Sequence, residues 1–274
     1  MKTDTFNSFV RDLYQSEEKF IPLHKPLFSG KEKEYLLETI DSTFVSSVGK
    51  FVDQVESFLA DYTKTSKGVA VVNGTAAIQV ALRLVGVSPG DEVITQALTF
   101  VATANSIAYN GAKPVFVDVD LETFNMDITD LLTKITNKTR AIMLIHILGT
   151  CSNMSKLISI ARRNNLEIIE DTCESLGAKF NNKNLGTFGR FGCISFHPTK
   201  NINSGYGGLF IQNDNSDDFD LARSIWERGT DRNKVISGLK RKYEWVSLGS
   251  SFQITERTNE QQHFEPHHVQ LYVL

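Results

Sequence analysis

Cysteine is scarce in this chain of 274 residues. Its three cysteines, Cys151, Cys173 and Cys193, lie far apart. An odd number at such spacing argues against a disulfide framework and against a zinc site built from neighbouring thiols. The pattern favours buried thiols in a reducing compartment.

Long hydrophobic runs and clusters of basic residues are absent as well. No apolar run approaches the roughly 20 residues of a membrane-spanning helix. The segment 1–6 lacks the apolar core of a secretory signal peptide. Lys and Arg total 29 against 32 Asp and Glu, for a formal net charge of −3. Such a balance gives no sign of a nucleic-acid-binding surface. Together these features predict a cytoplasmic protein that binds neither membranes nor nucleic acids.

The hydrophobic content of 41% is ordinary for a soluble protein with a real core. The length allows one large α/β domain or two small ones. No repeat or low-complexity linker divides the chain, so we expect one domain to dominate. Helical spacing of apolar residues predicts a helix over residues 4–18, an extended arm marked by Pro22 and Pro26, and helices over 30–43 and 52–62.

Short apolar runs then alternate with amphipathic segments. Strands are expected at 69–72, 93–94, 115–119, 141–145 and 166–169, and helices at 76–84, 102–109, 128–135 and 154–163. Continuous apolar strands separated by helices predict a mainly parallel sheet covered on both faces, which is a three-layer α/β/α fold. In such sheets ligands gather beyond the carboxyl ends of the strands.

The stretch 193–208 (CISFHPTKNINSGYGG) delivers one lysine into a loop. A short buried strand breaks at Pro198, which cannot donate to a sheet ladder, and a glycine-rich turn leads to a return strand at 209–211. Lys200 should therefore lie outside regular structure. Taken alone, such a lysine is either a solvated surface cation or a functional amine.

Three other strand ends carry further signals, each with an ordinary alternative. Residues 73–77 (NGTAA) are either a phosphate seat at a helix start or an Asn or Thr N-cap. Phe100 either covers a planar ligand or belongs to the core. Glu170 and Asp171 follow a buried strand, where a carboxylate could pair with a protonated heterocycle nitrogen or lie on a surface loop. Together with Lys200, these features are the requirements for binding pyridoxal 5'-phosphate.

Over residues 20–256 the chain resembles the DegT/DnrJ/EryC1/StrS sugar-nucleotide aminotransferases, within fold type I of the pyridoxal-phosphate enzymes. The motifs that carry the resemblance are 73–77 (NGTAA), 89–94 (PGDEVI), 99–105 (TFVATAN), 111–120 (GAKPVFVDVD), 170–171 (ED), 185–189 (LGTFG) and 195–201 (SFHPTKN). The resemblance implies an N-terminal helix and arm over residues 1–30 and a large cofactor-binding domain over 31–256.

The family pattern implies two catalytic residues. Lys200 would bond to the cofactor as an imine and shuttle the proton between cofactor and sugar, and Asp171 would keep the pyridine nitrogen protonated. Related deoxysugar dehydratases carry histidine at the lysine position, so Lys200 favours amino transfer. The other implied cofactor-binding positions are Gly74, Thr75 and Ser195 at the phosphate, Phe100 on the ring, Glu174 where many members carry glutamine facing the phenolic oxygen, and Ser251.

The resemblance also implies a substrate. Segments 20–24 and 41–50 resemble enzymes acting on nucleotide-linked 4-keto-6-deoxy sugars, including those of nonulosonic-acid pathways. Segments 226–232 and 245–251 resemble enzymes that make 4-amino-4,6-dideoxyhexoses. We therefore expect transamination of such a sugar in the synthesis of bacterial surface polysaccharide (lipopolysaccharide O-antigen, capsule or nonulosonic acid), with glutamate as amino donor and a homodimer as the assembly.

The sequence also departs from the family pattern. Tyr206 stands where many members have glutamate. Residues 257–274 no longer match, so we expect the C-terminal small domain to be largely missing, as in a truncated reading frame. His263, His267 and His268 lack a fourth ligand, so an irregular tail is favoured over a metal site. An inactive or binding-only protein and a deoxysugar dehydratase stay open as alternatives.

Overall fold

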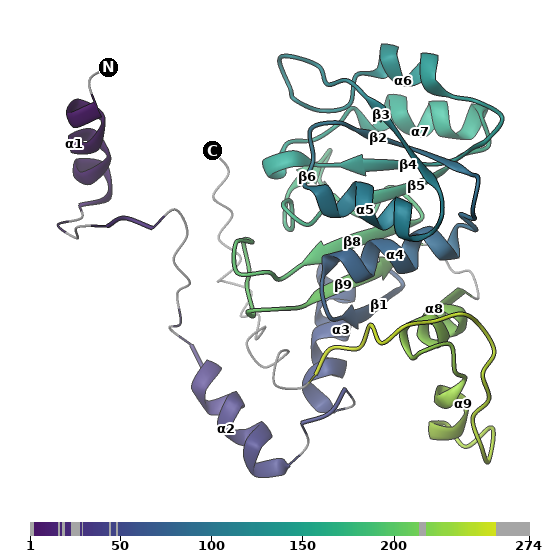
Figure 1. The fold of residues 1–274 in the computed structure, drawn as a ribbon. Helices are drawn as coiled ribbons and strands as arrows, with labels where there is room; N and C mark the ends of the chain where they lie inside the picture. Colours follow the sequence, from purple (N-terminus) through teal and green to yellow (C-terminus); the bar gives the residue numbers. More distant parts are fainter. Residues whose placement is uncertain are drawn as a thin grey trace.

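The computed structural model describes residues 3–15, 17, 20–22, 28, 30–43, 45–47, 49–213 and 218–255. Its centre is a seven-stranded sheet in the order β1-β9-β8-β5-β4-β2-β3 (Figure 1). The strands of this sheet are β1 Lys67–Val71, β2 Glu92–Gln96, β3 Lys113–Val117, β4 Thr139–Ile145, β5 Glu167–Asp171, β8 Phe191–Ser195 and β9 Gly208–Gln212. A separate hairpin joins β6 Lys179–Phe180 to β7 Lys183–Asn184.

Helices occupy most of the connections between the strands. They are α1 Thr3–Tyr14, α2 Glu32–Ser42, α3 Lys50–Thr63, α4 Gly74–Leu84, α5 Val101–Tyr109, α6 Ile128–Lys134, α7 Met154–Arg163, α8 Asp218–Trp226 and α9 Arg232–Ile236, with a 3-10 turn η1 at Ile147–Gly149. None of the helices in the described ranges is both long and apolar enough to span a bilayer.

Strand direction confirms the mainly parallel sheet. Strands β3, β2, β4, β5 and β8 pair in parallel, whereas β9 is antiparallel to both of its neighbours, β8 and β1. Because β9 is antiparallel to both β1 and β8, these two strands run in the same direction. The carboxyl ends of β1, β4, β5 and β8 therefore share one edge of the sheet.

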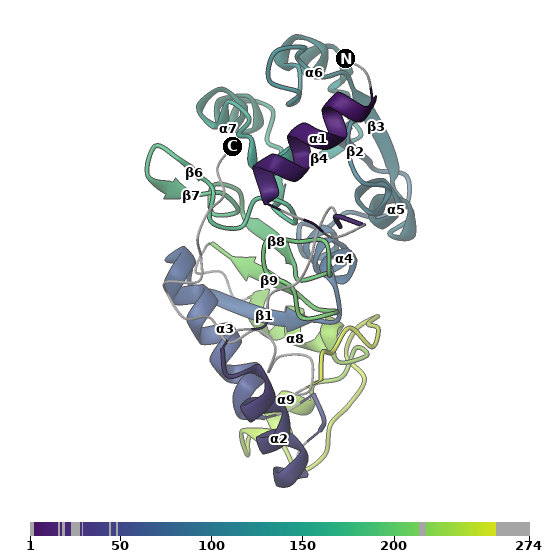
Figure 2. The same cartoon turned by 90° about the vertical axis from the view of Figure 1, so that its left-hand side faces the viewer.

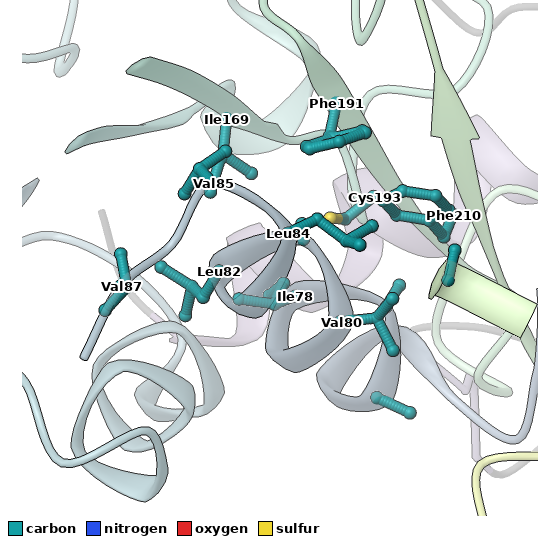
Figure 3. Packing of buried hydrophobic residues seen from close by; sticks show 14 of the residues in the cluster. Ile78, Val80, Leu82, Leu84, Val85, Val87, Ile169, Phe191, Cys193 and Phe210 are labelled. Atoms are coloured by element: carbon teal, nitrogen blue, oxygen red, sulfur yellow. The ribbon is translucent and has the colours of Figure 1, made fainter. Parts of the chain in front are cut away.

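The two faces of the sheet are covered by different helices, which confirms the three-layer arrangement. Alternate strand residues point to opposite faces: Ile169 packs with α4, α5 and α8, and Ile168 packs with α6 and α7. Helix α3 covers β1, β8 and β9 on the same side as α6 and α7. Figure 2 shows α3 and α7 on the left of the sheet and α4 and α5 on the right. Figure 3 shows α4 packed on Ile169, Phe191 and Phe210.

Several sequence predictions need correction. The first helix ends at Tyr14 instead of residue 18. Strand β5 continues through Asp171, so Glu170 and Asp171 lie inside the strand and not in a loop after it. Helices α8 and α9 and the β6–β7 hairpin were not predicted. Indole Nε1 of Trp226 in α8 donates to the Ala70 carbonyl at 2.7 Å, which fixes this helix to β1.

Some sequence predictions lie outside the described residues. These are Pro26 in the predicted arm, residues 23–24 of one substrate motif, and the tail 257–274 with its three histidines.

Candidate active site

The start of α4 packs closely against Cys173, which follows β5, and against Ser195 at the end of β8. A Cβ atom added to Gly74 would lie 2.7 Å from Cys173 Sγ and 2.9 Å from Ser195 Cβ. Such contacts are too short for any side chain, so only glycine fits here without movement of its neighbours. The structure thus brings together the segments after β1, β5 and β8, as the sequence predicted for Gly74 and Ser195.

Asn73 caps helix α4. Its Oδ1 accepts from the Ala76 amide at 2.8 Å, and its carbonyl accepts from Ala77 at 3.2 Å. The N-cap interpretation is therefore confirmed. Within the described part of the chain, the amide of Thr75 has no hydrogen-bond acceptor. The cap leaves this N–H, at the positive end of the helix, for an anionic group.

Asp171 is 7% exposed and its two carboxylate oxygens are held separately. Oδ2 accepts from the hydroxyl of Thr103 in α5 at 2.8 Å, and Oδ1 accepts from the Cys173 amide at 3.2 Å. The interpretation of this acid as part of a surface loop is wrong, because the strand continues and turns the side chain toward α5. Thr103 lies within a motif that carries the resemblance, but sequence reasoning gave it no role.

Lys200 lies in the loop between β8 and β9, as predicted from Pro198 and the glycines. Its side chain is only 15% exposed, and Nζ lies 3.3 Å from Glu174 Oε1. The other oxygen, Glu174 Oε2, accepts from the amide of Leu148 at 3.2 Å. The interpretation of Lys200 as a solvated surface cation is therefore wrong.

The pKa of the Cys173 thiol is affected by two charged neighbours. Burial raises its pKa well above the usual value, Asp171 raises it further, and Lys200 acts in the opposite direction. The geometry agrees, because the Cys173 amide donates to Asp171 Oδ1 and the next residue, Glu174, pairs with Lys200. The two predicted catalytic side chains share one small region at the sheet edge.

Phe100 and Ser251 differ from the other predicted residues because both are exposed. Phe100, the residue before α5, is 71% exposed, so the interpretation of it as core is wrong. Ser251 forms an isolated β-bridge with Glu227. The next residue, Phe252, accepts from the Val72 amide at 2.8 Å, which places this segment beside the end of β1.

Comparison with known proteins identifies the family. The sequence matches the family model described as the DegT/DnrJ/EryC1/StrS aminotransferase family over residues 27–258. The chain belongs to this family.

Family members with curated names include GDP-perosamine synthases. The chain is 43% identical over 196 residues to that of Escherichia coli O157:H7 and 40% identical over 238 residues to that of Caulobacter vibrioides. The aligned parts cover 72% and 86% of this chain but 54% and 61% of those relatives, so the chain spans little more than half their length. Among solved structures, a Streptococcus pneumoniae protein in its PLP-form superposes with a TM-score of 0.81 at 27% identity, over 88% of this chain and 64% of that protein.

Proposed function

We propose that this member of the DegT/DnrJ/EryC1/StrS family is the cofactor-binding part of a pyridoxal-phosphate-dependent aminotransferase that acts on a nucleotide-linked keto sugar. The observation that carries the proposal is the position of Lys200. Its amine is largely buried and paired with Glu174 at the same sheet edge where Asp171 is held by two donors. The PLP-form of the similar S. pneumoniae protein supports the same cofactor here.

The residues present fit this cofactor. Because Gly74 has no side chain, Cys173 and Ser195 can pack directly against the start of α4, which places the Ser195 hydroxyl beside the helix N-terminus. The Thr75 amide and the Ser195 hydroxyl are the donors that such an anion needs. We assign phosphate binding to these three residues, Gly74, Thr75 and Ser195.

The bound cofactor supplies an electron sink, a pyridine ring that accepts negative charge when its nitrogen is protonated. Asp171, held in place by Thr103 and Cys173, would keep a proton on that nitrogen. The amine of Lys200 would hold the cofactor covalently and then carry a proton to and from the reacting carbon. Glu174 would orient this amine.

Phe100 and Ser251 complete the proposed cofactor site. The exposed ring of Phe100 at the start of α5 would cover one face of the cofactor, since aromatic rings stack on planar ligands. Ser251, beside the end of β1, would add a hydroxyl to the phosphate environment.

The substrate belongs to the class of nucleotide-linked sugars, and we propose a 4-keto-6-deoxy sugar with glutamate as amino donor. The names of the two GDP-perosamine synthases support the nucleotide sugar. We further propose a homodimer and a role in bacterial surface polysaccharide synthesis. The large domain would span residues 31–256, following an arm over 1–30.

The cofactor assignment is tested by adding pyridoxal 5'-phosphate to the purified chain. Visible absorbance should appear, and borohydride reduction should fix one cofactor per chain on the peptide that contains Lys200. Lys200→Ala should abolish this covalent label. Lys134→Ala, at an exposed lysine paired with Asp130 on α6, should leave it unchanged. Equal labelling of wild type and Lys200→Ala would refute the assignment.

The reaction is tested with a nucleotide-linked 4-keto-6-deoxy sugar and glutamate. An aminotransferase should form 2-oxoglutarate and an amino sugar in equal amounts. Loss of water from the sugar without consumption of glutamate would identify a dehydratase instead. Cofactor binding with neither product would indicate the inactive or binding-only alternative.

A further inference from the structure

The carboxylate of Glu170 is completely buried and accepts four hydrogen bonds. The amides of Phe188 and Gly189 both donate to Oε1 at 2.6 Å. The amide of Gly186 donates to Oε2 at 2.8 Å, and His146 Nε2 lies 3.0 Å from the same oxygen. A buried carboxylate is tolerated only when its oxygens are paired. Three of the partners are backbone N–H donors, and an ionised carboxylate requires the tautomer of His146 that carries its proton on Nε2.

These four donors come from two segments that Glu170 ties to β5. One is the loop 186–189, which lies so close to the sheet that a Cβ on Gly189 would be 2.5 Å from the Ile168 carbonyl oxygen. The other is the end of β4 at His146. Glu170 points to the face of α6 and α7, opposite to Asp171, because neighbouring strand residues alternate between faces.

His146 connects the buried carboxylate of Glu170 to the segments that carry Asp171 and Glu174. Its own amide donates to the Asp171 carbonyl at 3.3 Å. It is also the residue before the turn Ile147–Gly149, in which the amide of Leu148 donates to Glu174.

The turn needs an anchor, because Leu148 has a left-handed conformation with φ 50° and a side chain that is 82% exposed. A leucine in this conformation is strained and contributes little packing. The buried pair of His146 and Glu170 lies directly before it in the chain.

We propose that Glu170 is a positioning residue for the cofactor site. By holding His146 and the loop 186–189, it fixes the backbone of Asp171 and, through the turn at Leu148, the orientation of Glu174 against Lys200. The inference rests on the proposed cofactor function and adds a residue that does not touch the cofactor.

Glu170→Gln is the sharpest variant because it keeps the size and shape of the side chain. An amide has one oxygen acceptor, and its NH₂ group would face N–H donors that now point at a carboxylate oxygen. Glu167→Gln is the matched control. It changes the same residue type at the other end of β5, where Glu167 makes a partly exposed ion pair with Arg190.

Titration with pyridoxal 5'-phosphate, followed by absorbance, gives the readout. Glu170→Gln should weaken cofactor binding about tenfold, as expected for lost hydrogen bonds to a buried charge, and should shift the absorbance maximum. Glu167→Gln should match wild type in both. Melting of each cofactor-free protein is measured in parallel, because a purely structural role would lower the melting temperature and leave the affinity and spectrum of the folded protein unchanged. That pattern would overturn the proposal.

A second pair of variants decides the matter if Glu170→Gln does not fold. His146→Gln places an amide donor where Nε2 lies, and should retain near-wild-type affinity and spectrum. His146→Leu removes the donor, and should reproduce the weaker binding. Equal affinity in wild type and His146→Leu would refute the positioning role. Failure of the wild-type chain to bind the cofactor would instead refute the proposed function, so the two failures are distinguishable.

Discussion

The hydroxyl of Thr103 donates a hydrogen bond to Asp171 Oδ2 across 2.8 Å. This bond joins the first turn of α5 to the carboxyl end of β5, and both residues are buried. The same turn begins immediately after Phe100. This one side-chain contact therefore ties the segment of the proposed ring cover, Phe100, to the proposed partner of the ring nitrogen, Asp171.

Thr103→Val should weaken cofactor binding and lower stability. Valine has nearly the shape of threonine but leaves Asp171 Oδ2 without this donor, a loss of about 1.5–3 kcal/mol for a bond to a charged group. Cofactor titration and urea unfolding measure the two effects. Thr99→Val is the control, because Thr99 contacts the Thr103 hydroxyl at 2.9 Å but not the carboxylate. Larger losses from Thr99→Val than from Thr103→Val would contradict this account.

Gly74→Ala should lower the free energy of unfolding by about 1–3 kcal/mol, as overpacking typically does. The new methyl group would meet Cys173 Sγ and Ser195 Cβ inside ordinary contact distance. We also expect weaker cofactor binding, since the helix start must move. Gly30→Ala serves as the control because Gly30 is exposed and faces only the flexible side chain of Glu32. An unaltered affinity in Gly74→Ala would contradict the assignment of the helix start to phosphate binding.

Asp231 should make stability depend on pH in the acid range. Its pKa is lowered by hydrogen bonds from the Glu244 amide and from Lys240, so the folded state favours the charged form. A carboxyl with a lowered pKa stabilises the fold above its unfolded pKa, about 4, and this contribution is lost as the pH falls through the folded pKa.

Asp231→Asn should therefore destabilise the protein more at pH 7 than at pH 3, because pH 3 lies below the unfolded pKa and part of the contribution is already lost there. Urea midpoints at both values give the comparison. Asp41→Asn, at an exposed residue on α2, should be neutral at both. A loss of stability in Asp231→Asn that is the same at pH 7 and pH 3 would show that the charge of Asp231 is not involved.

The three thiols should react slowly in the folded protein. Burial raises the pKa of Cys151 to about 11, with a further contribution from Glu170, and burial raises the pKa of Cys193 as well. Only a small thiolate fraction then exists near neutral pH. Labelling with a thiol reagent should be slow for the native chain and rapid for all three cysteines in denaturant. Rapid labelling of any one thiol in the native protein would contradict its raised pKa.

The sequence was sufficient for the parallel part of the fold because local and tertiary preferences agree there. Helix α7 has the predicted bounds, 154–163, since its apolar spacing matches its buried face. The loop that carries Lys200 could be predicted equally well, because proline and glycine limit or widen the backbone angles of their own positions. Gly74 and Ser195 came together because parallel strands bring their carboxyl ends to one edge.

The end of β5 was not predictable in the same way. The apolar run stops at Ile169, which indicates the end of a strand, yet the strand continues through Glu170 and Asp171. What permits this is the set of donors around Glu170, and these come from residues far along the chain. Helix α8 was likewise missed because it depends on packing against β1, including the contact of Trp226 with Ala70.

The antiparallel strand β9 has a consequence for how the protein is made. Strand β1 is the first strand in the chain, and within the described sheet its neighbour is β9, the last. The hydroxyl of Ser66, just before β1, donates a hydrogen bond to the carbonyl of Gln212, 146 positions later. A chain emerging from the ribosome must therefore hold β1 unpaired until nearly the whole sheet has been synthesised. Strand β1 leads directly into Gly74 at the start of α4, so we expect this part of the proposed cofactor site to take its final place only after β9 has been made.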